Sequence, residues 1–266
     1  MADSDQVRRA LVQKLESLHR SGVRSIPRPT LVPVVESKPA STENRVAGPS
    51  EKTPQSVSSP PAKQQPAADT FTSSPLPAAD RASALQVLAE EVSNCTLCAE
   101  LAEKRTQTVF GVGNPNARLV FFGEAPGADE DRMGEPFVGK AGQLLTKIIE
   151  ACQMKREDVY ILNVLKCRPP GNRNPTPEEA TACRPFFEKQ LEIIRPEMIC
   201  CLGSIAAQTL LNSTISVGRM RGKFHDWRGI QVAVTYHPAY LLRNPAAKKM
   251  TWTDMKMIMK QLGMEL

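Results

Sequence analysis

The sequence predicts an α/β protein with three layers, α/β/α, in which helices cover both faces of a central, mainly parallel sheet of four strands. Short apolar runs alternate with segments whose apolar residues recur at helical spacing, a pattern typical of a parallel sheet covered by helices. The first 80 residues lack this alternation, hold half of the prolines and contain one aromatic residue, Phe71. We therefore expect a disordered Pro/Ser/Ala-rich tail over residues 1–80 and one globular domain over residues 81–266.

Strands and helices are expected in regular order along the globular domain. Apolar runs predict four strands, at residues 118–122, 159–164, 198–202 and 231–235. Helical spacing predicts five helices, around residues 85–92 and over 139–152, 176–194, 204–211 and 251–262. The helix over 176–194 has the clearest start signal, because Thr176 can cap it and Pro177 fits its first turn.

The tail contains one segment with helical periodicity. Residues 5–21 place Val7, Leu11, Leu15 and Leu18 on one face, and Gly22 can end the helix. This short amphipathic helix is interpreted either as a marginal helix or as a docking element for a protein partner.

Composition limits the partners and the compartment. The formal net charge of +6 and the pI near 9.0 suit an anionic partner such as nucleic acid. No apolar run is long enough to span a membrane, and the first residues lack the features of a signal peptide. We therefore expect a cytoplasmic protein, in which seven cysteines serve as metal ligands or buried thiols instead of disulfides.

Four cysteines have the spacing of a metal site. Cys95 and Cys98 form a Cys-x-x-Cys pair, Cys167 follows a predicted strand directly, and Cys183 lies within a predicted helix. Because the last two do not form a second Cys-x-x-Cys pair, an iron-sulfur cluster is favoured over a structural zinc site, which stays open. The other three cysteines lie in apolar segments and are expected to be core thiols: Cys152, Cys200 and Cys201.

Four further motifs follow in order. They are Gly-Glu-Ala-Pro-Gly at 123–127, Pro-Phe-Val-Gly-Lys-Ala-Gly-Gln-Leu-Leu at 136–145, Asn-Val-Leu-Lys-Cys-Arg-Pro-Pro at 163–170, and His-Pro-Ala-Tyr-Leu-Leu-Arg at 237–243. With the cysteines, they resemble the family 4 uracil-DNA glycosylases, the iron-sulfur type, over residues 81–266. The resemblance implies a monomeric, monofunctional enzyme that removes uracil from single- or double-stranded DNA and leaves an abasic site. It also implies a 4Fe-4S cluster, on Cys95, Cys98, Cys167 and Cys183, that holds the fold and performs no redox step.

The same resemblance assigns roles in uracil binding. Phe137 corresponds to the aromatic residue that stacks on the flipped base, and Asn163 to the residue that reads the uracil edge. His237 corresponds to the histidine that donates to uracil O2 as negative charge develops. Gly123 and Ala125 are expected to lie close to the base, where small side chains leave room.

Two carboxylates are candidates for positioning water, Glu124 and Glu130. Family 1 enzymes carry an Asp where this chain has Ala125, so the carboxylate must come from elsewhere or be unnecessary. The segment 129–131 has a second interpretation as a solvated acidic turn. The sequence decides neither this choice nor the protonation of His237.

The remaining predicted site residues are expected to contact DNA. In the superfamily, the loop that holds Leu241, Leu242 and Arg243 enters the minor groove and fills the vacated stack. Arg221, in the basic run 219–223, is expected to contact phosphate, and Asn172 to lie near the site. The alternative for the 237–243 motif is the start of a helix.

Two other classes of function compete with excision. One is a cluster-bearing DNA-binding or lesion-sensing module without excision activity. The other is an electron-transfer protein. The full set of Glu124, Phe137, Asn163 and His237 argues against both.

Overall fold

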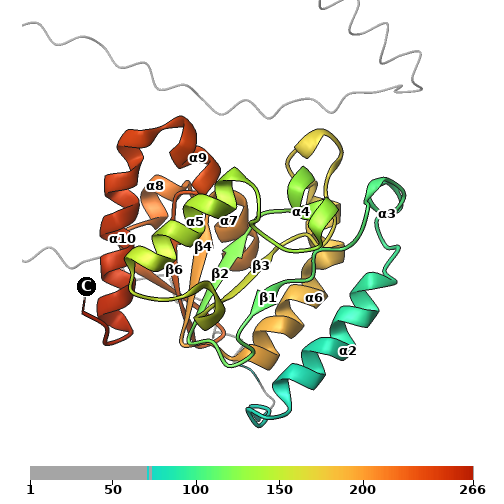
Figure 1. The fold of residues 1–266 in the computed structure, drawn as a ribbon, viewed down its shortest axis with the longest axis horizontal. Helices are drawn as coiled ribbons and strands as arrows, with labels where there is room; N and C mark the ends of the chain where they lie inside the picture. Colours follow the sequence, from blue (N-terminus) through green and yellow to red (C-terminus); the bar gives the residue numbers. More distant parts are fainter. Residues whose placement is uncertain (1–70, 72–73, 266) are drawn as a thin grey trace, which may run out of the picture. The chain divides into compact units, whose positions relative to one another are not determined.

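The computed structural model describes Phe71 and residues 74–265, and the predicted helix over 5–21 lies outside them. The described residues form one six-stranded sheet with the order β1-β3-β2-β4-β6-β5 (Figure 1). The strands are β1 (Val112–Gly113), β2 (Leu119–Gly123), β3 (Tyr160–Asn163), β4 (Met198–Leu202), β5 (Phe224–Trp227) and β6 (Ile230–Thr235).

The four predicted strands are the inner, parallel part of this sheet, β3-β2-β4-β6. Two short antiparallel edge strands, β1 and β5, were missed, so the sheet has six strands instead of four. Gly123 is paired with Asn163 in register, and Leu202 with Thr235. Because parallel strands end at the same edge of a sheet, residues from four chain segments meet there.

The helices follow the predicted order, with additional short ones. The longer helices are α2 (Arg81–Ser93), α5 (Lys140–Ala151), α6 (Pro177–Ile194), α7 (Ser204–Leu211) and α10 (Lys248–Gln261). The shorter ones are α3 (Ala99–Lys104), α4 (Ala128–Met133), α8 (Val217–Met220) and α9 (Pro238–Arg243), with 3₁₀ turns at Arg156–Asp158, Pro170–Asn172 and Pro245–Ala247. The start signal of α6 is confirmed, because Thr176 and Glu179 form a capping box and Pro177 occupies the first turn.

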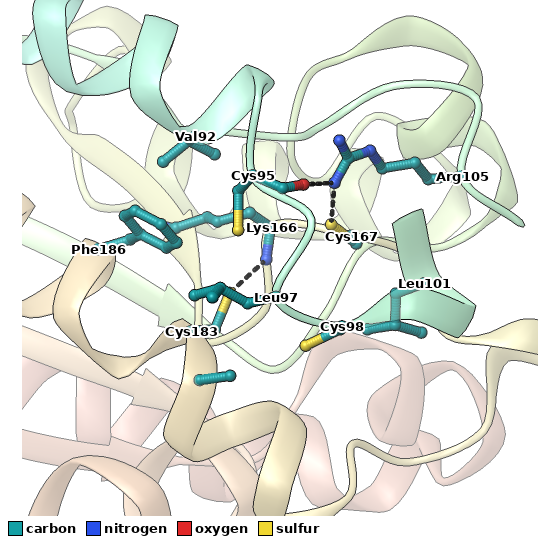
Figure 2. A pocket seen from close by; sticks show the side chains of 11 residues that line it. Val92, Cys95, Leu97, Cys98, Leu101, Arg105, Lys166, Cys167, Cys183 and Phe186 are labelled. Carbon is teal, nitrogen blue, oxygen red and sulfur yellow. Dashed lines mark hydrogen bonds between the residues drawn. The ribbon is translucent and has the colours of Figure 1, made fainter. Parts of the chain in front are cut away.

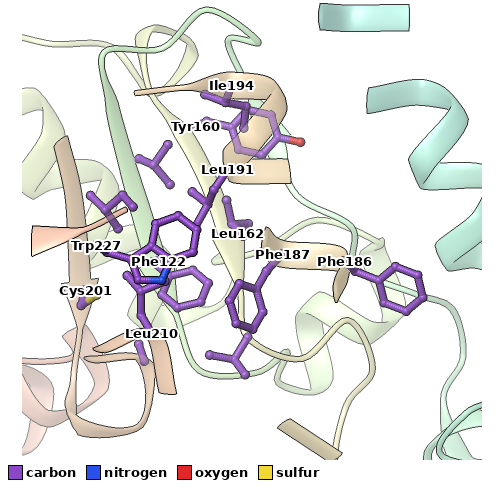
Figure 3. Close-up of a cluster of buried hydrophobic side chains, with 14 of the residues drawn as sticks. Phe122, Tyr160, Leu162, Phe186, Phe187, Leu191, Ile194, Cys201, Leu210 and Trp227 are labelled. Carbon is purple, nitrogen blue, oxygen red and sulfur yellow. The ribbon is translucent and has the colours of Figure 1, made fainter. Parts of the chain in front are cut away.

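Helices cover both faces of the sheet, as predicted. Along β2, Val120 and Phe122 point into a core shared with α2, α6 and α7, part of which Figure 3 shows around Phe122 and Phe187. Leu119 and Phe121 point the other way, into a core shared with α5 and α10. Because successive side chains of β2 point to opposite faces of the sheet, this strand packs against the helix layers on both faces.

The three cysteines predicted as core thiols are confirmed as such. Cys152, Cys200 and Cys201 are each 0% exposed within these cores. Burial raises the pKa of Cys152 to about 11, so this thiol is neutral near pH 7.

Packing extends into the segment expected to be a tail. The ring of Phe71 meets the ring of Trp227 edge-on, with centroids 5.6 Å apart. The guanidinium carbon of Arg195 lies 3.9 Å from the centre of the Phe71 ring. Phe71 thus attaches the chain to the strand β5 some ten residues before α2 begins.

No helix within the described residues is long and apolar enough to cross a membrane.

Candidate active site and cysteine cavity

A cleft of about 850 Å³ opens at the carboxyl ends of the inner strands. Its lining brings together most of the predicted uracil-binding and catalytic residues: Glu124, Ala125, Glu130, Phe137, Asn163 and His237. They follow β2, β3 and β6, which is where an open α/β sheet binds its ligands. The volume is within the usual range for small-molecule sites and admits a nucleotide.

Asn163 ends β3 and places its amide against the floor of this cleft. The side chain is 1% exposed, yet its Oδ1 atom has no hydrogen-bond partner. Gly123 lies directly beside it: a Cβ at Gly123 would stand 2.6 Å from the Phe137 ring and closer still to Asn163 Oδ1. The close approach of Asn163 and Phe137 therefore requires glycine at 123. An unsatisfied acceptor in a cleft indicates that a ligand supplies the donor.

The loop after α4 holds Phe137 in an uncommon conformation. Its φ is 55°, in the left-handed region that a bulky residue rarely adopts. The carboxylate of Glu130 fixes this loop, because its Oε1 atom accepts from the backbone N–H groups of Val138 at 2.9 Å and Gly139 at 3.0 Å. Its Oε2 atom accepts from Gly127 N–H at 3.0 Å, which ties the two motifs together.

The two candidate carboxylates differ in what they bind. Glu130 is occupied by three backbone donors, which makes it a residue that shapes the cleft. Glu124 is half-buried at the cleft and makes no side-chain hydrogen bond within the described part of the chain. Burial raises the pKa of Glu124 above its ordinary value. Glu124 is therefore the carboxylate available to a water molecule. The solvated-turn interpretation of 129–131 is wrong for Asp131, which is 3% exposed and accepts from Thr106.

His237 caps the N-terminus of α9, and this contact defines its tautomer. Its Nδ1 atom accepts from the Ala239 N–H at 3.1 Å, so the neutral ring carries its proton on Nε2. Burial is the main cause that lowers the pKa of His237 to about 4; the nearby Arg243 acts in the same direction, and Glu130 opposes them. The imidazole is thus neutral near pH 7, and its ring lies 5.5 Å from that of Phe137.

The predicted DNA wedge is only partly exposed. The 237–243 motif forms the helix α9, and this helix turns Leu241 into the protein, where it is 1% exposed. Leu242 is 44% exposed, and Arg243 is exposed at the cleft. The expectation that Leu241 forms part of the wedge is therefore wrong, because its position on α9 directs its side chain into the core.

The predicted phosphate contact of Arg221 is also corrected. Its guanidinium forms a two-pronged ion pair with the buried Asp254, at 2.9 and 3.0 Å, and donates to the Met250 carbonyl. Arg219 and Lys223, on either side of it, are exposed. Asn172 lines the cleft as expected, and its Oδ1 atom accepts from Arg168 at 2.7 Å.

Two tyrosines that the sequence analysis did not select also line the cleft. Tyr236 and Tyr240 stack with their ring centroids 5.0 Å apart, and Arg221 lies 5.5 Å from the Tyr236 ring. The two tyrosines are four residues apart, on either side of His237, where α9 starts. Residues at this spacing lie on the same side of a helical turn, so the spacing could have identified the pair.

The four predicted ligand cysteines line a second, smaller cavity, between α2, α3 and α6 (Figure 2). Cys95 follows α2, Cys98 caps α3, Cys167 follows β3, and Cys183 lies on α6. In the described residues, no three His, Cys, Asp or Glu side chains adopt the arrangement expected around a single metal ion.

Hydrogen-bond donors point at two of these sulfurs. Arg105 Nη1 donates to Cys167 Sγ at 3.1 Å and to the Cys95 carbonyl at 2.8 Å, and the Lys166 backbone N–H donates to Cys183 Sγ at 3.4 Å (Figure 2). Burial raises the pKa of Cys183 to about 11 and those of Cys98 and Cys167 above the ordinary value. A bound cationic metal centre would favour deprotonation of these thiols. The donor set, four thiols in an apolar cavity with N–H groups directed at sulfur, fits an iron-sulfur cluster.

Comparisons with known proteins agree with this geometry. Residues 110–256 match the family described as the Uracil DNA glycosylase superfamily. A Type-4 uracil-DNA glycosylase of Archaeoglobus fulgidus is 45% identical over 187 residues, which cover 67% of this chain and 94% of that protein. The corresponding proteins of Thermotoga maritima (48% over 162 residues, 60% and 84% coverage) and Saccharolobus solfataricus (43% over 188 residues, 67% and 87%) are also similar.

The chain therefore belongs to the type-4 uracil-DNA glycosylases. The family resemblance and the three-layer fold predicted from the sequence are confirmed.

Proposed function

We propose that the protein removes uracil from DNA by hydrolysing the N-glycosidic bond, which leaves an abasic site. The unpartnered Oδ1 atom of Asn163 carries this proposal, because it lies in the cleft beside Phe137 and a neutral His237. A flipped uracil supplies the missing donor from N3–H and an acceptor, O4, for the amide N–H₂. Cytosine reverses this pattern at both positions and is refused.

His237 stabilises the leaving base. Breaking the glycosidic bond places negative charge on the uracil ring, including O2. The Nε2–H group of a neutral imidazole donates to that oxygen, and its contribution grows as the charge develops. The contact of Ala239 N–H with Nδ1 holds the ring in this tautomer before substrate arrives.

Glu124 orients the attacking water. It is the cleft carboxylate whose oxygens are not used by backbone donors, and its half-buried position favours contact with a single water molecule. Glu130 acts by positioning, because it holds the Phe137 loop against the Gly123 loop.

DNA contacts follow from exposure around the cleft. Leu242 is an exposed apolar side chain of α9 and fills the stack that uracil leaves, while Arg243 stands beside it. Arg219 and Lys223 contact phosphates, which gives affinity without sequence preference.

Cys95, Cys98, Cys167 and Cys183 hold a 4Fe-4S cluster. When bound, the cluster links α2, α3, the loop after β3 and α6, and excision requires no electron from it. Cys167, in the chain after β3, and Cys183 of α6 line the same cavity.

Single-turnover excision from an oligonucleotide with one uracil, followed by alkali cleavage of abasic sites, tests the proposal. His237→Ala should bind this DNA nearly as well as the wild type and excise about a hundred- to a thousandfold more slowly, the usual effect of losing one such donor. His225→Ala is the matched control, because His225 bonds the Met220 carbonyl outside the cleft and its loss should leave the rate unchanged. Binding without excision by the folded wild type would support the lesion-sensing alternative instead.

A further inference from the structure

Two stacked tyrosines belong to a part of the cleft that the recognition of uracil does not use. The rings of Tyr236 and Tyr240 have centroids 5.0 Å apart and planes inclined by 22°, and both residues line the cleft. The aromatic groups assigned to uracil are different ones, Phe137 and His237. Although Tyr240 stacks on Tyr236, it is 39% exposed. An exposed aromatic ring beside a nucleic-acid site is a surface on which a base can stack.

Contacts with the core hold this pair in place. The guanidinium carbon of Arg221 lies 5.5 Å from the centre of the Tyr236 ring. The same guanidinium forms its two-pronged ion pair with Asp254, whose side chain is 0% exposed. Arg221 is therefore a fixed cation that keeps the Tyr236 ring in position, and Tyr240 packs on an ordered neighbour. A ring that is ordered before a ligand arrives loses little conformational freedom when the ligand stacks on it.

The cleft leaves room for a second base. Its volume of about 850 Å³ lies near the upper end of the usual range for sites that hold a drug-sized ligand, whereas uracil is a single pyrimidine ring. Tyr236 directly precedes His237, and Tyr240 lies on α9, which begins directly after His237. The stacked pair thus continues the proposed uracil site through one short chain segment. A second base in this cleft is therefore expected to come from the nucleotide that is joined to the uracil nucleotide.

The surroundings of Tyr240 suit a nucleotide of single-stranded DNA. Arg243 lies three residues further along α9, is exposed and lines the cleft, so it offers a cation to a phosphate next to the stacked base. Stacking on an aromatic ring tolerates any base, because every base has a π face. In duplex DNA the neighbour of uracil is held by its complementary base and by the helix stack. In a single strand the same base is free to leave its neighbours.

We propose that Tyr240, supported by Tyr236, binds the base of a nucleotide directly next to uracil in single-stranded DNA. The inference rests on the proposed function, because the uracil itself must occupy the part of the cleft at Asn163. Tyr240 and Leu242 then serve different substrates. Leu242 fills the stack of a duplex, and Tyr240 supplies a stacking partner for a single strand.

Binding of single-stranded oligonucleotides with an abasic neighbour tests this site. The full probe carries 2′-deoxy-2′-fluorouridine, whose fluorine slows cleavage of the glycosidic bond, so that affinity is measured without excision. In two further probes a tetrahydrofuran residue replaces the nucleotide on the 5′ side or on the 3′ side. The wild type should bind one of these two about five- to a hundredfold more weakly than the full probe, the usual effect of losing one base–aromatic stack, and that side identifies the stacked neighbour. Equal affinity for all three probes would overturn the proposal.

Tyr240→Ala shows whether this residue makes the contact. It should bind the full probe about five- to a hundredfold more weakly than the wild type and lose no further affinity when the neighbour is abasic. Discrimination against the abasic neighbour as strong as in the wild type would remove Tyr240 from the site. Tyr240→Phe is the matched control, because it keeps the ring and should bind as the wild type does. If Tyr240→Ala does not fold, Tyr240→Leu replaces it, because leucine keeps an apolar side chain without the ring, and the same two results decide.

Duplex probes and an excision assay separate this inference from the proposed function. When the complementary strand is annealed, Tyr240→Ala and Tyr240→Phe should bind equally well. A loss in Tyr240→Ala as large as on the single strand would overturn the assignment to single-stranded DNA. A wild-type protein that excises no uracil from an ordinary oligonucleotide would instead refute the proposed function, while the binding measurements would still decide whether Tyr240 stacks on a base.

Discussion

Gly123→Ala tests the tight contact between the Gly123 loop, Asn163 and Phe137. An added Cβ would stand 2.6 Å from the Phe137 ring, whereas ordinary van der Waals contact begins at 3.4 Å. The ring or the strand end must then move by the difference, 3.4 − 2.6 = 0.8 Å, and Asn163 Oδ1 by more. A misplacement of about 1 Å at a reacting centre can cost about a hundredfold in rate.

We therefore expect Gly123→Ala to lower single-turnover uracil excision by about a hundredfold. The φ angle at Gly123 is not in the left-handed region, so the backbone itself accepts alanine. Gly218→Ala on α8 is the control, because its added methyl meets no atom within 4 Å. A Gly123→Ala protein with wild-type excision would refute the claim that Asn163 and Phe137 must approach this closely.

Three further predictions follow from the site and the domain edge. The acid limb of the pH–rate profile should come from Glu124, whose pKa is raised by burial. Activity should therefore fall as this carboxylate is protonated, at a pH above the ordinary range for Glu. Glu124→Gln should be slower and should lose that limb. His237, whose pKa is about 4, should add no step between about pH 8 and pH 5, and a step in that window that persists in Glu124→Gln would contradict its neutral assignment. Phe71→Ala should lower the melting temperature by about 4–8 °C, equivalent to ~2 kcal/mol of lost ring and cation–π contacts, with excision unchanged, and calorimetry checks this.

Strong local patterns in the sequence predicted the central fold. The four inner strands are apolar runs buried on both faces, and α6 carries its capping signal within four residues. The edge strands lack such a signal: β1 has two residues, and β5 has one buried residue, Trp227. Their pairing is decided by neighbouring strands, which no local pattern reveals.

The candidate site was predicted by residue type and order, and the errors concern direction. The motif named Leu241 and Leu242 together, but the rotation of α9 decides which one faces solvent. The partner of Arg221 is Asp254, 33 residues away, so the ion pair could not be seen locally. Lys166 would ordinarily be placed on the surface, because lysine is rarely buried without a partner, yet it is 1% exposed.

The central claim, that the Asn163 amide reads uracil, is tested most directly by excision rates on matched oligonucleotides that differ in one base, uracil or cytosine. After treatment with the wild type and then alkali, only the uracil-containing strand should be cleaved. Asn163→Asp should lose at least about a hundredfold on uracil, because a carboxylate offers only acceptors and adds negative charge beside a ring that becomes anionic. It should keep its visible cluster absorbance and its melting temperature within a few degrees. Wild-type uracil excision by folded Asn163→Asp would contradict the account.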